Sequence, residues 1–247
     1  MQRLVITPEQ FGDASIVNLT NEQRHYLLSV LRLRPGDRLI VLDGCGKGWL
    51  AALTSEETLN LLEPYIFKTE LSRPIHLVAA LPKSGFDEVV RCCTELGVTR
   101  ITPIISARTI LKPSANKLKR WQKIATEAAE QSERAFVPKI LTPLKFTDYL
   151  DSLEHPHYLC AARAKSKHLL DVLVASPPSK HSSKLSFCIG PEGGWTDKEI
   201  EQAIAQGMET VSLGRSILRA VTAAITTISI ANATLSTERL YKGAEDF

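Results

Sequence analysis

The chain has 247 residues, of which 44% are hydrophobic and 23% are charged, the proportions of a globular protein with a substantial core. No apolar run approaches the roughly 18 residues of a membrane span, and the amino terminus lacks the pattern of a secretory signal peptide. The five cysteines form neither a disulfide framework nor a C-x-x-C pair, so we expect a reduced, cytoplasmic protein without a bound metal. The net charge of +3 permits a nucleic-acid partner without demanding one.

Residues 1–70 predict a small β-rich unit of barrel type. Thr20 and Gln23 form a capping box, which predicts a helix after Thr20. Asp43 opens a glycine-rich stretch that lies between two predicted strands with no helix after it, so a hairpin turn is expected and not a nucleotide-binding loop. The strands are predicted at residues 3–6, 39–42, 49–53 and 59–67.

From residue 75 onward, predicted strands and helices alternate, which indicates an α/β domain with a mainly parallel sheet. Residues 75–81 are continuously apolar, as expected of a strand buried on both faces. A long helix over residues 112–134 has its basic residues first and its acidic residues last, the reverse of what the helix dipole favours, which points to a functional basic end. The other elements are helices at 86–96, 147–153 and 168–174 and strands at 100–105, 139–141 and 158–162, before an exposed connector at 176–184.

Two strand–loop–helix units follow one another near the carboxyl end. A strand at residues 185–189 precedes the loop 190–194, and a capping box of Thr196 and Glu199 starts a helix that runs to about Gly207. A second strand at 211–213 is followed by a glycine loop and an uncharged helix over 220–235. Two such loops after neighbouring parallel strands predict one ligand pocket at the carboxyl edge of the sheet, although both could be ordinary turns.

Neither loop follows a common phosphate-binding pattern. A single carboxylate, Glu192, stands between Pro191 and Gly193, and it suits a ligand with hydroxyl groups or a positive centre better than a phosphate. The sequence GPEGGWTDKE followed by LGRSILRAVTA resembles the signature of the SPOUT, or trefoil-knot, RNA methyltransferases. More narrowly, it resembles the ribosomal RNA small subunit methyltransferase E family. The segments HYLLSVLR, TELGVTRITPIISART and RWQKIATEAAEQSER extend the resemblance over nearly the whole chain.

The resemblance implies both an architecture and an activity. A PUA-like, RNA-binding β-barrel domain would occupy residues 1–72, and a trefoil-knotted SPOUT methyltransferase domain would occupy 73–247. The family uses S-adenosylmethionine to methylate N3 of a uridine in 16S rRNA, so we expect that substrate, within the 30S subunit. A helix that is apolar on nearly every side must be buried centrally or between subunits, and the family's usual homodimer is expected here.

The resemblance and the required chemistry together give candidate site residues. Methylation needs the N3 proton removed and the resulting uracil anion stabilised, and Arg219 is the expected catalytic residue, although a salt bridge to Glu192 would give it a purely structural role. Backbone groups are expected to hold S-adenosylmethionine at Gly190, Glu192, Gly193, Leu213, Gly214, Ile217 and Leu218. RNA contacts are expected at Arg3, Arg24, His25, Arg32, Arg34, Lys119, Arg120 and Arg134.

Two other functions are alternatives, and departures from the family pattern at Ser216 and Val221 keep the second of them open. One is a different SPOUT activity, such as ribose 2′-O-methylation of tRNA or rRNA. The other is a non-catalytic RNA-binding or ribosome-assembly protein with a decayed enzyme domain. The departures are Arg91 and Cys92 in place of Gln and Lys, Ala107 in place of Glu, Glu133 in place of Gly, Ser216 in place of Arg and Val221 in place of Glu.

Overall fold

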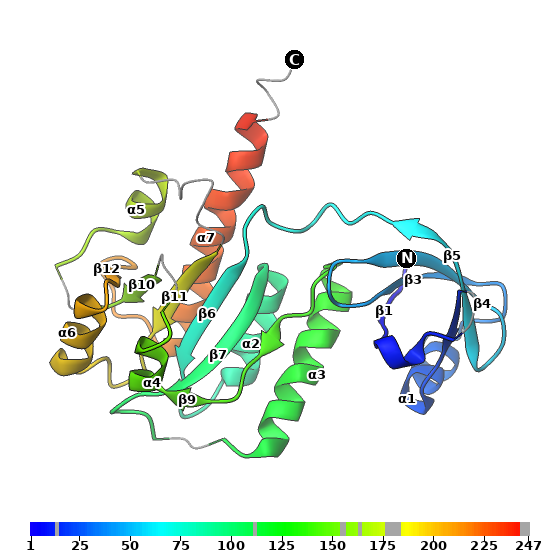
Figure 1. The fold of residues 1–247 in the computed structure, drawn as a ribbon, viewed down its shortest axis with the longest axis horizontal. Coiled ribbons are helices and arrows are strands. Elements are labelled where there is room, and N and C mark those ends of the chain that lie inside the picture. The colour runs from blue at the N-terminus through cyan, green and yellow to red at the C-terminus, as the bar shows by residue number, and fades with distance from the viewer. Residues whose placement is uncertain (13–14, 111–112, 154–156, 163–164, 176–183, 243–247) are drawn as a thin grey trace. The chain divides into compact units, whose positions relative to one another are not determined.

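The computed structural model describes residues 1–12, 15–110, 113–153, 157–162, 165–175 and 184–242, and the predicted connector at 176–184 therefore lies almost entirely outside the described residues (Figure 1). The chain divides into two compact units. The first is formed by Met1–Glu70 together with Thr126–Val137, and the second by Leu71–Ala125 and Pro138–Phe247. The sequence did not predict that residues far from the amino terminus would belong to the first unit.

The first unit is built on a five-stranded sheet with the strand order β1-β3-β4-β5-β2. Strand β1 pairs with β3 in parallel, and the remaining pairs are antiparallel. The four predicted strands are confirmed to within two residues at each end, whereas the short strand β2 was not predicted. The bounds are β1 Arg3–Val5, β2 Ile16–Asn18, β3 Arg38–Leu42, β4 Gly48–Leu53 and β5 Thr58–Tyr65.

Two short helical segments accompany this sheet. A 3₁₀ turn, η1, spans Pro8–Gln10. Helix α1 spans Asn21–Arg24, and its predicted capping box is confirmed, because the Thr20 side chain accepts a hydrogen bond from the Gln23 backbone N–H. The helix continues as a π-helical segment, η2, over His25–Val30, which the sequence pattern did not predict.

The second unit contains a seven-stranded sheet in which every recorded pairing is parallel, so the predicted parallel sheet is confirmed. The strand order is β12-β10-β11-β6-β7-β8, and β9 also pairs with β7. Strand β12 ends at Val211, two residues before the predicted end, which leaves a longer loop ahead of the last helix. The bounds are β6 Ile75–Ala80, β7 Val98–Ile105, β8 Lys139–Ile140, β9 Leu144–Lys145, β10 His157–Cys160, β11 Leu185–Ile189 and β12 Glu209–Val211.

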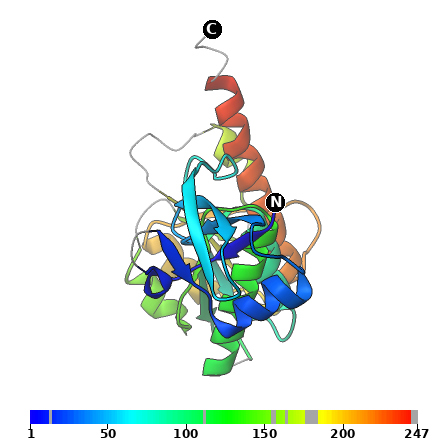
Figure 2. The ribbon, with the colours of Figure 1, turned by 90° about the vertical axis from the view of Figure 1, so that its right-hand side faces the viewer.

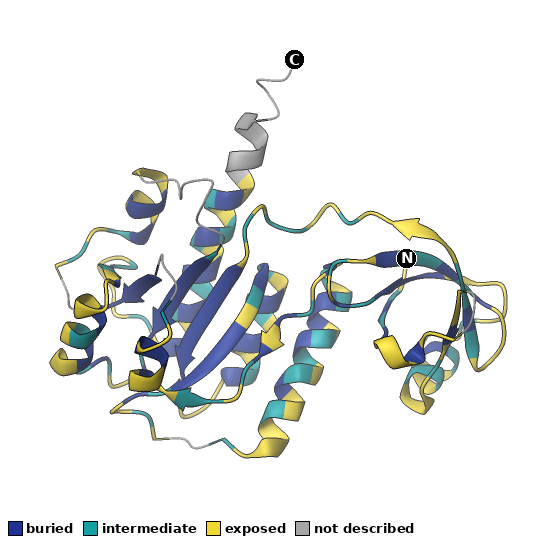
Figure 3. Cartoon of the chain, in the orientation of Figure 1, coloured by how far each residue is buried: buried dark blue, intermediate teal, exposed yellow. Residues whose placement is uncertain are grey.

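Helices pack on both faces of this sheet, and the central strands β6, β10 and β11 are buried (Figure 3). Alternate side chains of β6 face opposite sides of the sheet. Val78 and Ala80 face the side that α4 and α6 cover, because they share a core cluster with residues of these two helices. Helices α2 and α7 pack against each other and against the strands (Figures 1 and 2). The bounds are α2 Phe86–Glu95, α3 Ala115–Gln131, α4 Phe146–Leu150, α5 Leu169–Ala175, α6 Asp197–Ala205 and α7 Ala220–Lys242. None of the helices in the described parts of the chain has the length and apolar character of a membrane span.

The last helix, α7, is only partly buried in the single chain, so it is not a central helix covered on all sides, and its burial between subunits stays a prediction. Ala224, Ile228 and Leu235 lie in the core, whereas Thr222, Ser229 and Ala233 form an exposed stripe. An uncharged stretch such as residues 220–235 can present such a stripe to solvent when the residues of the stripe are small or carry hydroxyl groups. The stripe is open to solvent or to a partner.

A row of polar residues crosses the second sheet near the amino-terminal ends of its strands. His157, Ser186 and His76 are neighbours in register on β10, β11 and β6, and all three are buried. The His76 Nε2 atom lies 2.7 Å from the Oγ1 atom of Thr102 on β7. Burial, with the nearby charges of Arg100, His157 and Lys184, lowers the pKa of His76 from 6.5 to about 3. The native protein therefore holds His76 neutral.

Replacement of His76 by glutamine is expected to make the protein less sensitive to acid. Because the pKa of His76 is lowered on folding, its contribution to stability is complete above the unfolded pKa of 6.5 and is lost as the pH falls toward 3. For any folded pKa well below 5, the loss between pH 8 and pH 5 is about 2 kcal/mol. Urea denaturation at these two pH values should show that, between pH 8 and pH 5, the free energy of unfolding falls by about 2 kcal/mol more in the wild type than in H76Q. Equal losses would contradict this expectation.

Candidate functional site

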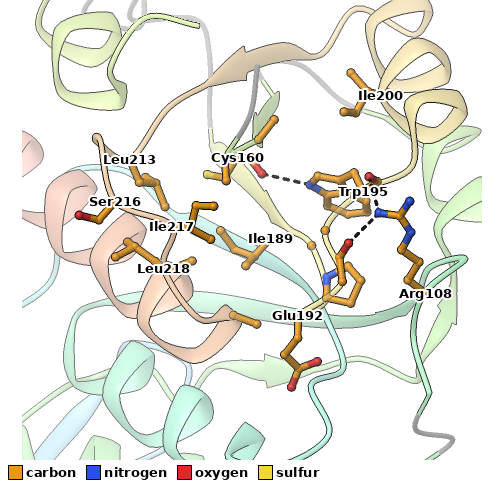
Figure 4. Close-up of a pocket in the computed structure, with 18 of the residues that line it drawn as sticks. Arg108, Cys160, Ile189, Glu192, Trp195, Ile200, Leu213, Ser216, Ile217 and Leu218 are labelled. Carbon is orange, nitrogen blue, oxygen red and sulfur yellow. Dashed lines mark hydrogen bonds between the residues drawn. The ribbon is translucent and has the colours of Figure 1, made fainter. Parts of the chain in front are cut away.

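Two loops at the carboxyl edge of the parallel sheet line one cavity with a volume of about 540 Å³ (Figure 4). The first loop follows β11, and the second follows β12. The prediction that these loops share a cavity is confirmed. All seven residues predicted to hold a methyl donor line it, namely Gly190, Glu192, Gly193, Leu213, Gly214, Ile217 and Leu218.

The first loop is fixed by close packing around Trp195. A Cβ atom on Gly190 would lie 3.0 Å from the Trp195 ring, so any other residue would force the indole to shift by a few tenths of an ångström. The ring Nε1–H donates to the Cys160 carbonyl at 3.1 Å, which ties the loop to the end of β10. The loop also contains a turn in which the Gly194 N–H donates to the Pro191 carbonyl at 2.8 Å. The backbone of this loop is therefore well positioned to contact a ligand directly.

Arg108 also supports the first loop, and the sequence analysis did not single it out as a site residue. Its Nη1 atom donates to the Gly193 carbonyl at 2.7 Å and to the Trp195 carbonyl at 3.3 Å. Its aliphatic stem lies where a side chain on Gly193 would be, 3.1 Å from the Cβ position. Arg108 follows β7 at the same sheet edge as the two loops, and that position was the available signal. Cys160 and Trp195 line the cavity as well and were likewise not predicted.

The second loop supplies an apolar wall. Leu213, Ile217 and Leu218 all line the cavity, and Ile217 remains 69% exposed. The loop turns at Gly214, which has a φ of +120° and donates its N–H to the Ser212 hydroxyl at 3.2 Å. The second loop therefore gives the cavity an apolar side.

The structure does not show the salt bridge between Arg219 and Glu192 that would give Arg219 a purely structural role. The Glu192 Oε1 atom accepts a hydrogen bond from the Lys83 backbone N–H at 2.9 Å. Arg219 is exposed, and in the described part of the chain its guanidinium has no recorded hydrogen bond or ion pair. It lies between two cavity-lining residues, Leu218 and Ala220, at the start of α7, and its carbonyl accepts from the Ala223 N–H at 2.8 Å. Arg219 is thus a cation with no recorded partner among the described residues; it stands between two lining residues but is not itself one of them.

The thiols near the cavity are poor candidates for covalent chemistry. Cys160 lines the cavity, but burial raises the pKa of its thiol to about 12. Burial also raises the pKa of the neighbouring Cys188 well above the ordinary value. Since the thiolate is the nucleophilic form, both groups stay protonated and unreactive at neutral pH. The chemistry of this site therefore depends on charge and on backbone polarity.

Two of the arginines predicted to contact RNA are structural instead. The Arg134 residue is 2% exposed, and its Nη2 atom lies 2.9 Å from the Glu70 carboxylate. The Arg3 side chain is 8% exposed, and its Nη2 atom lies 2.7 Å from the Glu133 carboxylate. A buried and paired guanidinium cannot reach a phosphate without breaking these contacts, so the RNA role predicted for Arg3 and Arg134 is corrected to a structural one.

The other predicted RNA-contact residues lie at the surface. Arg24 is half-buried and pairs with Glu57 at 2.7 Å. Arg120 is exposed and pairs with Asp87 at 2.6 Å on the second unit. His25, Arg32, Arg34 and Lys119 are exposed and have no recorded side-chain partner in the described ranges. RNA contact at these residues stays a prediction.

Comparison with known families agrees with the two-part organisation of the sequence. Residues 69–232 match the model of an RNA methyltransferase domain. Residues 19–62 match the model of an RNA methyltransferase PUA domain.

Individual relatives match over nearly the whole chain. The chain is 48% identical to the ribosomal RNA small subunit methyltransferase E of Synechocystis, over 94% of this chain and 78% of the relative. It is 31% identical to the protein of the same name from Bacillus subtilis, over 93% of this chain and 95% of that relative. The fold matches the crystal structure of the Neisseria gonorrhoeae ribosomal RNA small subunit methyltransferase E bound to S-adenosyl methionine. That match has a TM-score of 0.81 at 32% identity and covers 94% of this chain and 97% of the other.

Proposed function

Because the chain belongs to the ribosomal RNA small subunit methyltransferase E family, we propose that it transfers a methyl group from S-adenosylmethionine to N3 of a uridine in 16S rRNA. The observation that carries the proposal is the single cavity formed by the two glycine loops. The Neisseria gonorrhoeae relative, of the same fold, is bound to S-adenosyl methionine. This proposal makes the cavity the binding site of the methyl donor.

The residues of the cavity suit S-adenosylmethionine. Its volume of about 540 Å³ falls in the range of about 300–1,000 Å³ that is usual for small-molecule sites. Leu213, Ile217 and Leu218 offer apolar contacts for a nucleoside, and the backbone of Gly190 and Gly193 offers hydrogen-bonding groups. The Glu192 carboxylate adds negative charge for a ligand with a positive centre. When bound, the donor supplies an electrophilic methyl group.

The protein's own contribution to the chemistry is electrostatic. A neutral uracil N3 is a poor nucleophile, and the proton must leave before the nitrogen can attack. The positive charge of Arg219, together with the positive end of the α7 dipole, would lower the pKa of N3 and hold the anion by its carbonyl oxygens. This role is supported by the position of Arg219 between the lining residues Leu218 and Ala220, and by its having no recorded acidic partner among the described residues.

Further features belong to the same proposal. The substrate would be 16S rRNA within the 30S subunit, in the cytoplasm, and the two loops would form the family's trefoil knot. A two-fold dimer would cover the uncharged stripe of Thr222, Ser229 and Ala233 on α7. Light scattering at micromolar concentration should then give twice the mass of the chain. A monomer would refute the dimer and leave the activity untouched.

Methyl transfer from labelled S-adenosylmethionine tests the function directly. The purified chain should label 30S subunits from cells that lack this enzyme, and nucleoside mass spectrometry should find the methyl group on N3 of uridine. A methyl group on ribose would favour a different activity within the same fold. Calorimetry that shows no binding of S-adenosylmethionine would favour a non-catalytic RNA-binding protein.

A further inference from the structure

The turn that follows β7 crosses the end of β6 to reach the first loop. Strand β6 lies between β7 and β11 in the sheet, so contacts between the segments that follow β7 and β11 bridge the end of β6. The Thr109 Oγ1 atom accepts a hydrogen bond from the Ser106 N–H at 3.0 Å, and the Thr109 N–H donates to the Ser106 carbonyl at 3.0 Å. This turn carries two donors that bond to residues 85–92 positions further along the chain, namely the Ala107 N–H and the Arg108 guanidinium.

Glu199 accepts the first of these hydrogen bonds from a buried position. The residue is 7% exposed, and its Oε1 atom accepts from the Ala107 N–H at 2.8 Å. Its Oε2 atom accepts from the Thr196 N–H and from the Thr196 hydroxyl group, both at 2.8 Å. The capping box of α6 requires only the bond to the Thr196 N–H, so the bond to Ala107 serves another purpose. It ties the turn after β7 to the start of α6.

Arg108 supplies the second donor, and it holds two peptide groups in and just after the first loop. Its Nη1 atom donates to the Gly193 and Trp195 carbonyls, as the dashed lines of Figure 4 show. The N–H of the first of these peptide groups donates to the Pro191 carbonyl at 2.8 Å, and the N–H of the second donates to Glu199. Each peptide group is therefore held at both its oxygen and its nitrogen. Neither can rotate without breaking a hydrogen bond.

The neighbouring backbone of the first loop keeps donors for a ligand. Glu192 and Gly193 both line the cavity, and within the described residues their N–H groups have no recorded hydrogen bond. Gly193 is thus bonded on its carbonyl side by Arg108 and open on its amide side. A glycine-rich loop loses much conformational freedom when a ligand orders it. Hydrogen bonds that order the loop beforehand reduce that cost.

We propose that Arg108 and Glu199 are positioning residues that set the affinity for S-adenosylmethionine, because they hold the first loop in its ligand-binding shape before the donor arrives. Arg108 acts through the Gly193 peptide group, and Glu199 acts through the turn that presents Arg108. The inference rests on the proposed function in taking S-adenosylmethionine as the ligand. It assigns the strength of donor binding to residues outside the two glycine loops.

Replacement of Arg108 by methionine tests this role, because methionine keeps most of the aliphatic stem and loses every donor. R108M should bind S-adenosylmethionine about tenfold more weakly by calorimetry, as expected when a charge-assisted hydrogen bond is lost. Its kcat at saturating donor, and the pH dependence of kcat, should stay near the wild type, in contrast to R219A. R108K restores the charge and one donor group and should recover part of the affinity.

Hydrogen exchange without the donor measures the order of the loop itself. Amides of residues 190–196 should exchange faster in R108M than in the wild type, because the loop opens more often. R91M is the matched control, since Arg91 is an exposed arginine of the same unit that pairs with Glu95 one helical turn away at 2.7 Å. It should leave both the loop exchange and the affinity for S-adenosylmethionine unchanged.

Alanine at Gly193 tests whether Arg108 acts through this residue. The φ of Gly193 lies outside the left-handed region, so its backbone accepts alanine, but the new Cβ atom would lie 3.1 Å from the Arg108 Cδ atom. The Arg108 stem must then move, which loosens its hydrogen bonds. G193A should weaken donor binding about tenfold in the wild type and by less than about threefold in the R108A background, where the stem is absent.

Three results would overturn the inference while leaving the proposed function standing. One is wild-type affinity for S-adenosylmethionine in R108M, another is unchanged loop exchange in R108M, and the third is an equal effect of G193A in both backgrounds. A wild-type protein that does not bind S-adenosylmethionine would refute the proposed function, and this inference with it.

Discussion

Replacement of Arg219 by alanine is expected to lower kcat for methyl transfer by about a hundredfold to a thousandfold, the usual effect of removing one charge-stabilising donor. The affinity for S-adenosylmethionine and the Tm should stay near their wild-type values, because the Arg219 side chain is exposed and has no recorded contact in the described part of the chain. Single-turnover methylation of 30S subunits, with calorimetry of the methyl donor, measures both quantities.

The pH dependence of R219A distinguishes an electrostatic role from a structural one. If Arg219 lowers the pKa of uracil N3, the variant should recover activity as the pH rises, because the base then loses its proton without help. R215A is a matched control, since Arg215 is another exposed arginine, four residues before Arg219, and has no role in the proposed chemistry. It should keep a near-normal kcat. A near-normal kcat in R219A at pH 7 would show that another group carries the charge.

Replacement of Glu70 by alanine is expected to destabilise the first unit by about 3–5 kcal/mol, the cost of breaking one side of a buried ion pair. The Glu70 carboxylate accepts from the Arg134 guanidinium at 2.9 Å, from the Ala135 N–H at 2.7 Å and from the Phe136 N–H at 3.1 Å. The Arg134 and Glu70 side chains are 3% and 18% exposed, so solvent screens the pair weakly. One side chain thus holds residues from the middle of the chain within the first unit.

Hydrogen exchange measured by mass spectrometry reports this loss locally. In E70A, amides of β3, β4 and the stretch Thr126–Val137 should exchange about a hundredfold faster or more, whereas those of β6 and β11 should exchange as in the wild type. E57A is the matched control, because Glu57 pairs with Arg24 at a surface where the two side chains are 73% and 34% exposed. The free energy of unfolding of E57A should fall by about 1 kcal/mol or less. Unchanged exchange in E70A would show that the buried pair contributes little.

The RNA-binding residues show where reasoning from sequence fell short. Arg3, Arg32 and Arg134 look alike in the sequence, since each is a cation that was expected to contact RNA. The structure separates them, because Arg3 and Arg134 are buried against Glu133 and Glu70, whereas Arg32 is exposed in a strained conformation. The carboxylates of Glu133 and Glu70 lie 130 and 64 residues away along the chain, and no local pattern reports such a pairing.

Arg108 is a similar case within the candidate site. Its contacts to the carbonyls of Gly193 and Trp195 join residues 85 and 87 positions apart. The sequence could indicate only that Arg108 follows a strand, at the edge where ligand loops gather.

The sequence by itself determined the features that depend on near neighbours. Capping boxes at Thr20 and Thr196, the apolar strands β6 and β11 and the two glycine loops all follow from spacing within a few residues, and each is present in the structure. Tertiary structure alone decided which arginines are buried, which cation supports the glycine loop, and that Thr126–Val137 belongs to the first unit. The reason is physical: local patterns fix backbone conformation, whereas the burial and pairing of a charge depend on which distant segment packs against it.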